Sequence, residues 1–138
     1  METEKILDTA PIYRTYFPMQ NFMNFILCFT EKRVIFYFFD YWPYKYAPPT
    51  KYFKEMEEKE KELKAYEGNI DKLINSKDNS FEIPYEDFKK IRFVSEYRVY
   101  IKLNENHKSR RIALAYIINN QTLVKKLFKK YCASVFKK

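Results

Sequence analysis

The stretch Phe81–Leu103, FEIPYEDFKKIRFVSEYRVYIKL, decides the fold of this chain. Apolar and polar residues alternate over 81–85, the alternation breaks at Glu86-Asp87, and it returns before the end of the stretch. Alternation with a period of two is typical of antiparallel strands that bury one face. We therefore expect a sheet here, with Pro84 marking a sheet edge or a bulge.

Further strands are expected on both sides of this stretch. Phe25–Phe29 and Val34–Phe39 are short apolar runs joined by the letters TEKR, which predicts a hairpin whose strands are covered on both faces. Tyr97–Leu103 and Ile112–Tyr116 predict a second hairpin across the polar segment Asn104–Ser109. In the first strand of that hairpin, the alternation directs Arg98, Tyr100 and Lys102 to the face opposite Val99 and Ile101.

The remaining segments are expected to be helical or irregular. Lys51–Tyr66 has a narrow apolar stripe, which predicts a mostly solvated helix, and Asn69–Asn75 predicts a shorter one. Gln121–Lys137 predicts an amphipathic helix with a lysine-rich outer face. Residues 40–50 contain three prolines and are expected to be irregular, and 1–22 are expected to be irregular or to form an edge.

The composition bounds the kind of protein. A chain of 138 residues with 20% aromatic residues is one domain with a real core. The single glycine, Gly68, excludes a glycine-rich phosphate loop and a dinucleotide fingerprint. Cys28 and Cys132 lie far apart and His107 is the only histidine, so we expect no zinc site, no cofactor and reduced, buried thiols.

The chain has no segment that predicts export or membrane insertion. Met1–Asp8 is charged and lacks an apolar core, and the charge-free run Thr15–Thr30 is too short and too polar to span a bilayer. We therefore expect a cytoplasmic protein that at most touches a membrane surface.

The positive charge is concentrated in the last third of the chain. Tyr97–Lys138 has 11 basic residues against the one acidic residue Glu105, a net +10, whereas 1–96 has 15 against 17. A one-sided field of this kind favours an anionic partner, namely nucleic acid, an acidic protein or an anionic membrane. The alternative is a solvated surface that only keeps the protein soluble.

Two short motifs resemble those of the pleckstrin-homology-like domains of bacteria and archaea. Thr30, Lys32, Arg33 and Val34 match a T-x-K-R-hydrophobic hairpin, and a strand motif is matched by Ile83, Pro84, Tyr85 and Phe88. The likeness covers about Phe25–Phe136. It implies a bent sheet of seven strands capped by a C-terminal helix, so two strands beyond the five read above would come from 13–22, 40–47 or 88–94. The same fold carries lipid, peptide and protein binding, so the resemblance does not choose a ligand.

The expected fold class is therefore α+β: a pleckstrin-homology-like antiparallel β-barrel or sandwich, capped by a C-terminal α-helix. The whole chain, 1–138, would be one such domain, with a charged helical insertion at about 51–76 between strands.

The basic residues of the last third could form one anion-binding surface. Arginine offers bidentate forks and lysine point charges to phosphate or carboxylate groups. The candidates are Arg98, Lys102, Lys108, Arg110, Arg111, Lys125, Lys126, Lys129 and Lys130.

A second candidate surface is an aromatic loop. Tyrosine and tryptophan are favoured at membrane interfaces and protein hot spots, and they can stack on unpaired bases. The alternative is a lid over one end of the sheet. The candidate partner-contact residues are Tyr41, Trp42, Tyr44 and Tyr46.

No catalytic constellation is present in the sequence. Glu86 and Asp87 are adjacent, so they cannot flank a substrate, and any serine or cysteine nucleophile would depend on His107 alone. We therefore expect a non-enzymatic binding or adaptor module for an anionic membrane surface or an acidic protein, with no evident small-molecule substrate. The alternatives are a nucleic-acid- or ribosome-associated protein that uses the same basic face, and an enzyme subunit completed by a partner chain. The oligomeric state is left open.

Overall fold

The structure is a computed structural model that describes residues 4–16, 23–41, 50–95, 98–104, 111–116 and 121–133. The whole of 111–116 and several positions at the ends of other elements, Tyr41 and Arg98 among them, are described by their backbone alone. Over this part of the chain the fold is α+β. The strands are β1 (Asp8–Tyr16), β2 (Met23–Phe29), β3 (Arg33–Tyr41), β4 (Phe81–Pro84), β5 (Phe88–Ser95), β6 (Arg98–Leu103) and β7 (Arg111–Tyr116). The helices are α1 (Thr50–Lys64), α2 (Ile70–Asn75) and α3 (Gln121–Tyr131), and a short 3₁₀ turn, η1 (Tyr85–Asp87), links β4 to β5.

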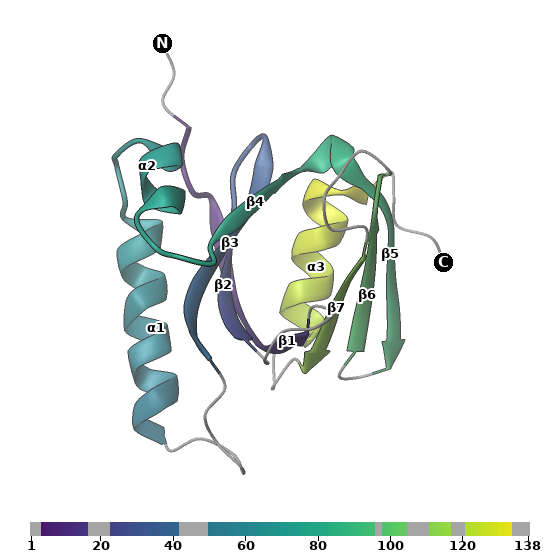
Figure 1. Ribbon diagram of the computed structural model, residues 1–138, viewed down its shortest axis with the longest axis horizontal. Coiled ribbons are helices and arrows are strands. Elements are labelled where there is room, and N and C mark those ends of the chain that lie inside the picture. The colour runs from purple at the N-terminus through teal and green to yellow at the C-terminus, as the bar shows by residue number, and fades with distance from the viewer. Residues whose placement is uncertain are drawn as a thin grey trace.

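The described strands form one antiparallel sheet of seven strands in the order β4-β3-β2-β1-β7-β6-β5. The sheet bends so that β2–β4 and β5–β7 lie on opposite sides of α3 (Figure 1). The expected barrel is wrong in one respect: β4 and β5 stand at the two ends of the order, so the described sheet is open. The three-residue turn η1 links these two edges along the chain without forming ladder hydrogen bonds between them.

The concave side of the sheet holds the main core, and α3 fills it. Val124, Leu127 and Phe128 of α3 are buried among side chains from both halves of the sheet. The Phe128 ring lies 5.4 Å from the ring of Phe29 on β2 and 6.1 Å from that of Phe88 on β5, measured between centroids. The C-terminal helix therefore joins the two halves of the sheet. It ends at Tyr131, earlier than the expected Lys137.

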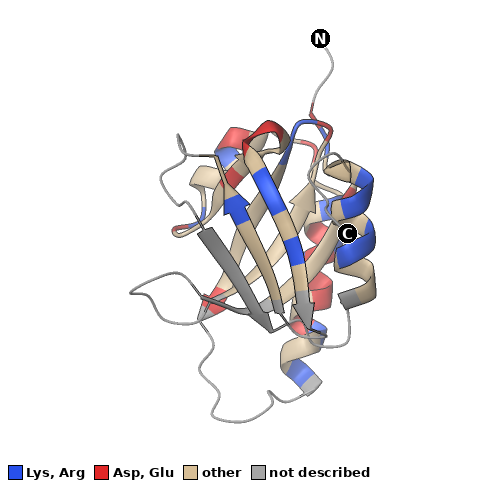
Figure 2. Cartoon of the chain, turned by 90° about the vertical axis from the view of Figure 1, so that its right-hand side faces the viewer, with Lys and Arg blue, Asp and Glu red and all other residues tan. Residues whose placement is uncertain are grey.

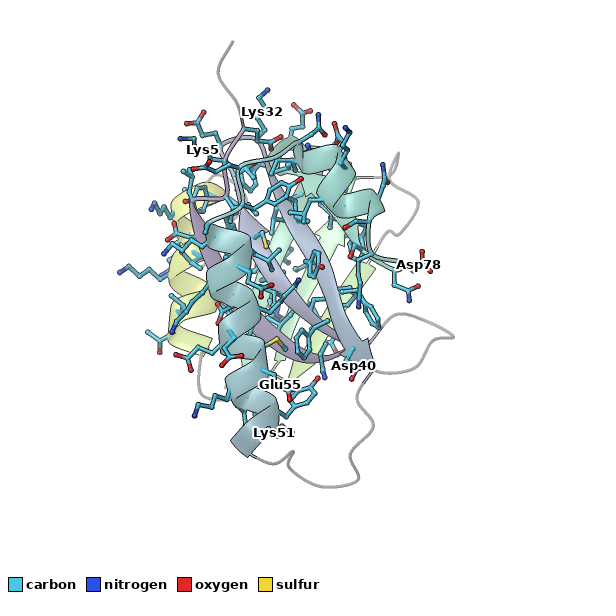
Figure 3. All side chains as sticks on the ribbon, turned by 90° about the vertical axis from the view of Figure 1, so that its left-hand side faces the viewer. Lys5, Lys32, Asp40, Lys51, Glu55 and Asp78 are labelled. Carbon is cyan, nitrogen blue, oxygen red and sulfur yellow. The ribbon has the colours of Figure 1, made fainter. Side chains whose placement is uncertain are left out.

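The convex side of β1–β3 is covered by the two helices between β3 and β4. Its outward apolar side chains, Ile26, Cys28, Ile35 and Tyr37, are buried under Tyr52, Met56 and Leu63 of α1 and Ile70 and Leu73 of α2. Figure 3 shows α1 lying across these strands. The expected coverage of both faces of β2 and β3 is confirmed. The narrow stripe on α1 is buried although most other α1 residues are exposed, because the strands beneath it present a second apolar face.

β1 was missed as a regular strand. It lies in the middle of the sheet, pairing with β2 from Asp8 to Thr15 and with β7 from Tyr13 to Tyr16. Pro11, which lacks an amide hydrogen, falls in the half that pairs with β2 alone. This one-sided pairing accommodates the proline that made the segment look irregular.

β5 falls on 88–94, one of the three places where the resemblance allows a further strand, but the alternation does not mark it, and a bulge explains why. Phe88 pairs with Leu103 and Lys90 with Lys102, so Lys89 is an extra residue in the ladder. Phe88 and Ile91 are therefore both buried although three positions apart, and Lys89 and Lys90 are both exposed. The bulge breaks the period of two that marks strands in a sequence.

Among the helices that the structure describes, none has the length and apolar character needed to cross a bilayer.

Candidate functional site: a basic outer face on β5–β7

The convex side of β5 and β6 carries exposed basic side chains, and the backbone of β7 continues this side of the sheet. Ile91, Val99, Ile101 and Leu103 point into the core. The side chains between them are exposed and include Lys90, Arg92, Tyr100 and Lys102. We call this set the β5–β7 outer face; Figure 2 looks onto it, with the basic positions of β5 and β6 in blue. No described helix packs on this side, in contrast to the convex side of β1–β3.

The strand register sets the spacing of these charges. Lys90 pairs with Lys102, and Lys102 pairs in turn with Arg111 of β7, so three basic positions form one row across the sheet. In the next row Arg92 pairs with Tyr100. Adjacent strands lie about 4.8 Å apart, and alternate residues on one strand lie about 6.8 Å apart. Like charges at this spacing repel one another, and an anionic ligand relieves the repulsion.

Lys90 and Arg92 were not among the candidates from the sequence. The sequence contains a sign of them: in KKIRF, two basic residues stand two positions apart, as residues on one face of a strand do. This segment precedes the alternating segment that contains Lys102. The bulge at Lys89 hid the strand and with it the face.

The four lysines of α3 form a different surface. Lys125, Lys126, Lys129 and Lys130 are exposed, but the apolar side of α3 packs on the concave face, whereas Lys102 leaves the convex face. The two sets therefore come from opposite sides of the sheet, and Figure 2 shows α3 and its basic positions beside edge strand β5. The helical period of the sequence predicts which side of α3 is exposed, but it does not predict where α3 lies relative to the strands.

Lys125 and Lys130 of α3 have contacts within the fold. Lys125 Nζ lies 5.6 Å from the centroid of the Phe93 ring, and Lys130 Nζ lies 3.0 Å from Asp8 Oδ2. The Tyr131 hydroxyl donates a hydrogen bond of 2.6 Å to the same Asp8 oxygen. Burial alone would raise the pKa of Asp8, but the hydrogen bonds from Tyr131 and Lys130 hold it below its usual value. Part of the α3 charge is thus used to attach the helix to β1.

Several candidates fall outside the described residues. Lys108, Arg110, Trp42, Tyr44 and Tyr46 do so entirely, and the side chains of Arg98, Arg111 and Tyr41 do so as well. The backbone places Arg98 and Arg111 on β6 and β7, and Tyr41 at the end of β3.

Within the described part of the chain, no group of His, Cys, Asp and Glu has the arrangement of a metal site. Cys28 and Cys132 are free and buried. Burial raises the pKa of the Cys132 thiol to about 12 and raises that of Cys28 further, so both thiols are protonated at neutral pH and are poor nucleophiles. His107 lies outside the described residues.

The two motifs that suggested a family meet at one end of the sheet. The Tyr85 hydroxyl donates a 2.6 Å hydrogen bond to the Thr30 carbonyl oxygen, and the Tyr85 amide donates to the Lys32 carbonyl oxygen. The Tyr85 ring also stacks on Tyr131 of α3, with centroids 5.6 Å apart. Burial raises the pKa of Tyr85 well above its usual value, which keeps the hydroxyl protonated as a donor. These contacts give the motif residues a structural role, fastening the β2–β3 turn to η1 and α3.

Replacing Tyr85 with phenylalanine is expected to lower the free energy of unfolding by about 1–2 kcal/mol, because the carbonyl of the fully buried Thr30 loses its donor. Urea unfolding followed by circular dichroism measures the change. Tyr66→Phe is the matched control, since the Tyr66 hydroxyl donates to the Asn69 carbonyl oxygen at an exposed site, where water replaces it. An equal effect of the two substitutions would contradict the role assigned to Tyr85.

Comparisons of the chain with protein families, with curated proteins and with solved structures find no match.

Proposed function

We propose that this chain is a pleckstrin-homology-like, non-enzymatic binding module that recognises an anionic partner through the β5–β7 outer face. The fold proposal is supported by the strand order, in which a central β1 pairs with both β2 and β7 and a C-terminal helix occupies the bend. It is also supported by the contact between the Thr30–Val34 hairpin motif and the Ile83–Phe88 strand motif.

The binding proposal depends on one observation: β5, β6 and β7 contain six basic residues and no acidic residue. Structural sheets usually mix both signs of charge, because like charges directly opposite each other destabilise the ladder. Here Lys90, Lys102 and Arg111 pair directly across three strands. The first candidate partners are an anionic membrane surface and an acidic protein, whose phosphate or carboxylate groups would lie between these cations.

The covered and uncovered surfaces support this face over the others. The convex side of β1–β3 is occupied by α1 and α2, and the concave side is occupied by α3. On the described part of α3, Lys125 and Lys130 have contacts within the fold. The β5–β7 outer face is the basic sheet surface that the described helices leave open.

The test compares two double variants with the same change of net charge. Lys90→Glu/Lys102→Glu reverses charge on the β5–β7 outer face, and Lys126→Glu/Lys129→Glu reverses it on α3. Binding is measured with phosphatidylserine-containing vesicles, polyglutamate, single-stranded RNA and duplex DNA at several salt concentrations. We expect the strand variant to bind its anionic ligand at least tenfold more weakly, and to show a shallower salt dependence, because counterion release scales with the contacts made. We expect the helix variant to lose much less.

Equal losses in the two variants would contradict the proposal, because net charge alone would then account for binding. Unchanged binding by Lys90→Glu/Lys102→Glu would contradict it as well. All four substituted side chains are exposed, so both variants are expected to fold, which circular dichroism checks.

A second candidate partner, nucleic acid, is favoured by a specific residue on this face, the exposed Tyr100.

A further inference from the structure

We propose that the anionic partner is a single-stranded nucleic acid and that Tyr100 is the platform on which one of its bases stacks. This inference rests on the proposed function, since it takes the β5–β7 outer face as the binding surface.

Tyr100 is placed as a stacking residue would be. Its side chain is 48% exposed although it belongs to β6, which is flanked by β5 and β7. Its neighbours in the same strand, Val99 and Ile101, are each 1% exposed. The ring is therefore held on the convex surface by a strand whose other face is anchored in the core, and it can bind without rearrangement of the backbone.

Cations lie beside the ring on β5 and further along β6, at the spacing of the sheet, whereas its partner on β7 is Ala113. Arg92 is the direct cross-strand partner of Tyr100, and Lys102 lies two residues further along β6. Lys90 pairs with Lys102, which places it diagonal to Tyr100. A base on the ring thus lies within about 5–8 Å of several positive positions where the phosphates on either side of it can bind.

The exposed ring together with the basic residues beside it favours one class of anionic partner over the others. An exposed ring on a sheet, with basic residues around it, is how single strands are bound by sequence-tolerant stacking, since an unpaired base exposes its π-face and a paired base does not. Membrane association through this face would call for apolar side chains that insert. Tyr100, Leu7 and Leu123 are the exposed large apolar residues of the described chain, and of these only Tyr100 lies on the β5–β7 outer face. An acidic protein would be attracted by the same basic residues, and tyrosine is also common in protein hot spots, so polyglutamate is one of the competitors in the test.

The test uses two substitutions at Tyr100. Tyr100→Phe keeps the ring, and Tyr100→Thr removes it while keeping a residue that favours strands. The probe is a fluorescein-labelled oligouridylate followed by fluorescence anisotropy, with duplex RNA of the same length, phosphatidylserine-containing vesicles and polyglutamate as competitors. We expect wild type to prefer the single strand. We expect Tyr100→Phe to bind it within about twofold of wild type and Tyr100→Thr to bind it about tenfold more weakly, as for loss of one stacked base.

The salt dependence separates stacking from charge. Tyr100→Thr is expected to keep the wild-type salt slope, whereas Lys90→Glu/Lys102→Glu makes the slope shallower. If Tyr100→Thr binds oligouridylate as tightly as wild type, the inference is overturned and the proposed function stands. If wild type prefers duplex RNA, vesicles or polyglutamate, the inference is overturned and the preferred ligand names the partner class. If wild type binds none of the four, both proposals fail.

Discussion

Replacing Phe128 with alanine is expected to lower the free energy of unfolding by about 4 kcal/mol, a large fraction of the stability of a domain of this size. The Phe128 ring is fully buried and packs edge to face against Phe29 of β2 and Phe88 of β5. Truncation leaves a cavity between the two halves of the bent sheet, so contacts are lost on both sides at once. Urea unfolding, monitored by far-ultraviolet circular dichroism, measures the change.

Leu123→Ala is the matched control on the same helix. Its side chain is 41% exposed, and truncation there is expected to change the free energy of unfolding by less than about 1 kcal/mol. Phe128→Leu should fall between the two, because it retains part of the volume. If Phe128→Ala cost no more than Leu123→Ala, α3 would not be the element that joins the halves of the sheet.

Replacing Arg33 with methionine is expected to cost about 3 kcal/mol near neutral pH. The Arg33 guanidinium binds Glu4 through two hydrogen bonds of 2.8 and 3.0 Å, and its Nη1 atom lies 3.0 Å from Asp71 Oδ1. Glu82 adds a third carboxylate at 3.9 Å from the same nitrogen. The side chains of Arg33 and Glu4 are only 16% and 15% exposed. Methionine keeps the aliphatic stem but leaves these carboxylates without their shared cation.

The cost of Arg33→Met is expected to shrink as the pH falls from 7 to about 3, below the usual pKa of a glutamate. Burial alone would raise the pKa of Glu4, but the hydrogen bonds from Arg33 and Thr30 and the charge of Arg33 lower it, so in wild type this stabilisation is lost as acid protonates the carboxylate. In the variant the burial remains without Arg33, so the pKa of Glu4 rises and protonation relieves the penalty. Lys32→Met, with an exposed side chain in the same turn, removes the same charge and is expected to change stability by less than about 0.5 kcal/mol at either pH. A pH-independent loss for Arg33→Met, or an equal loss for Lys32→Met, would contradict this account.

The sequence predicted the strands in which the order of apolar and polar residues directly reflects which faces of the strand are buried. The apolar runs of β2 and β3 and the alternation of β6 mark their covered faces directly, and both helices between β3 and β4 were expected close to their observed bounds. β1 and β5 overlap segments where the resemblance allowed further strands, but the residue pattern did not mark them, because it depends on the strands with which they pair. Pro11 is accommodated only where β7 does not pair, and the extra residue Lys89 shifts the alternation by one.

The sequence predicted which side of its own strand or helix each candidate residue lies on. It did not predict how these strands and helices combine into one surface. Alternation along β6 indicated that Tyr100 and Lys102 share a face, and the helical period indicated which side of α3 carries lysine. Whether those two sides coincide depends on which face of the sheet α3 covers, and this choice is made by long-range packing around Phe128. That Lys90 and Arg92 belong to the same face follows only from the register of β5 with β6.

The pairing of β1 with both β2 and β7 has a consequence for the nascent chain. β2 is synthesised soon after β1 and can pair with its first half early, whereas the partner of its second half, β7, emerges only after β3–β6. Until then the backbone amides and carbonyls of 13–16 form an unsatisfied strand edge in the middle of the future sheet. Such an edge can recruit another chain, so a translation product interrupted before Arg111 would be a substrate for chaperones or a seed for aggregation.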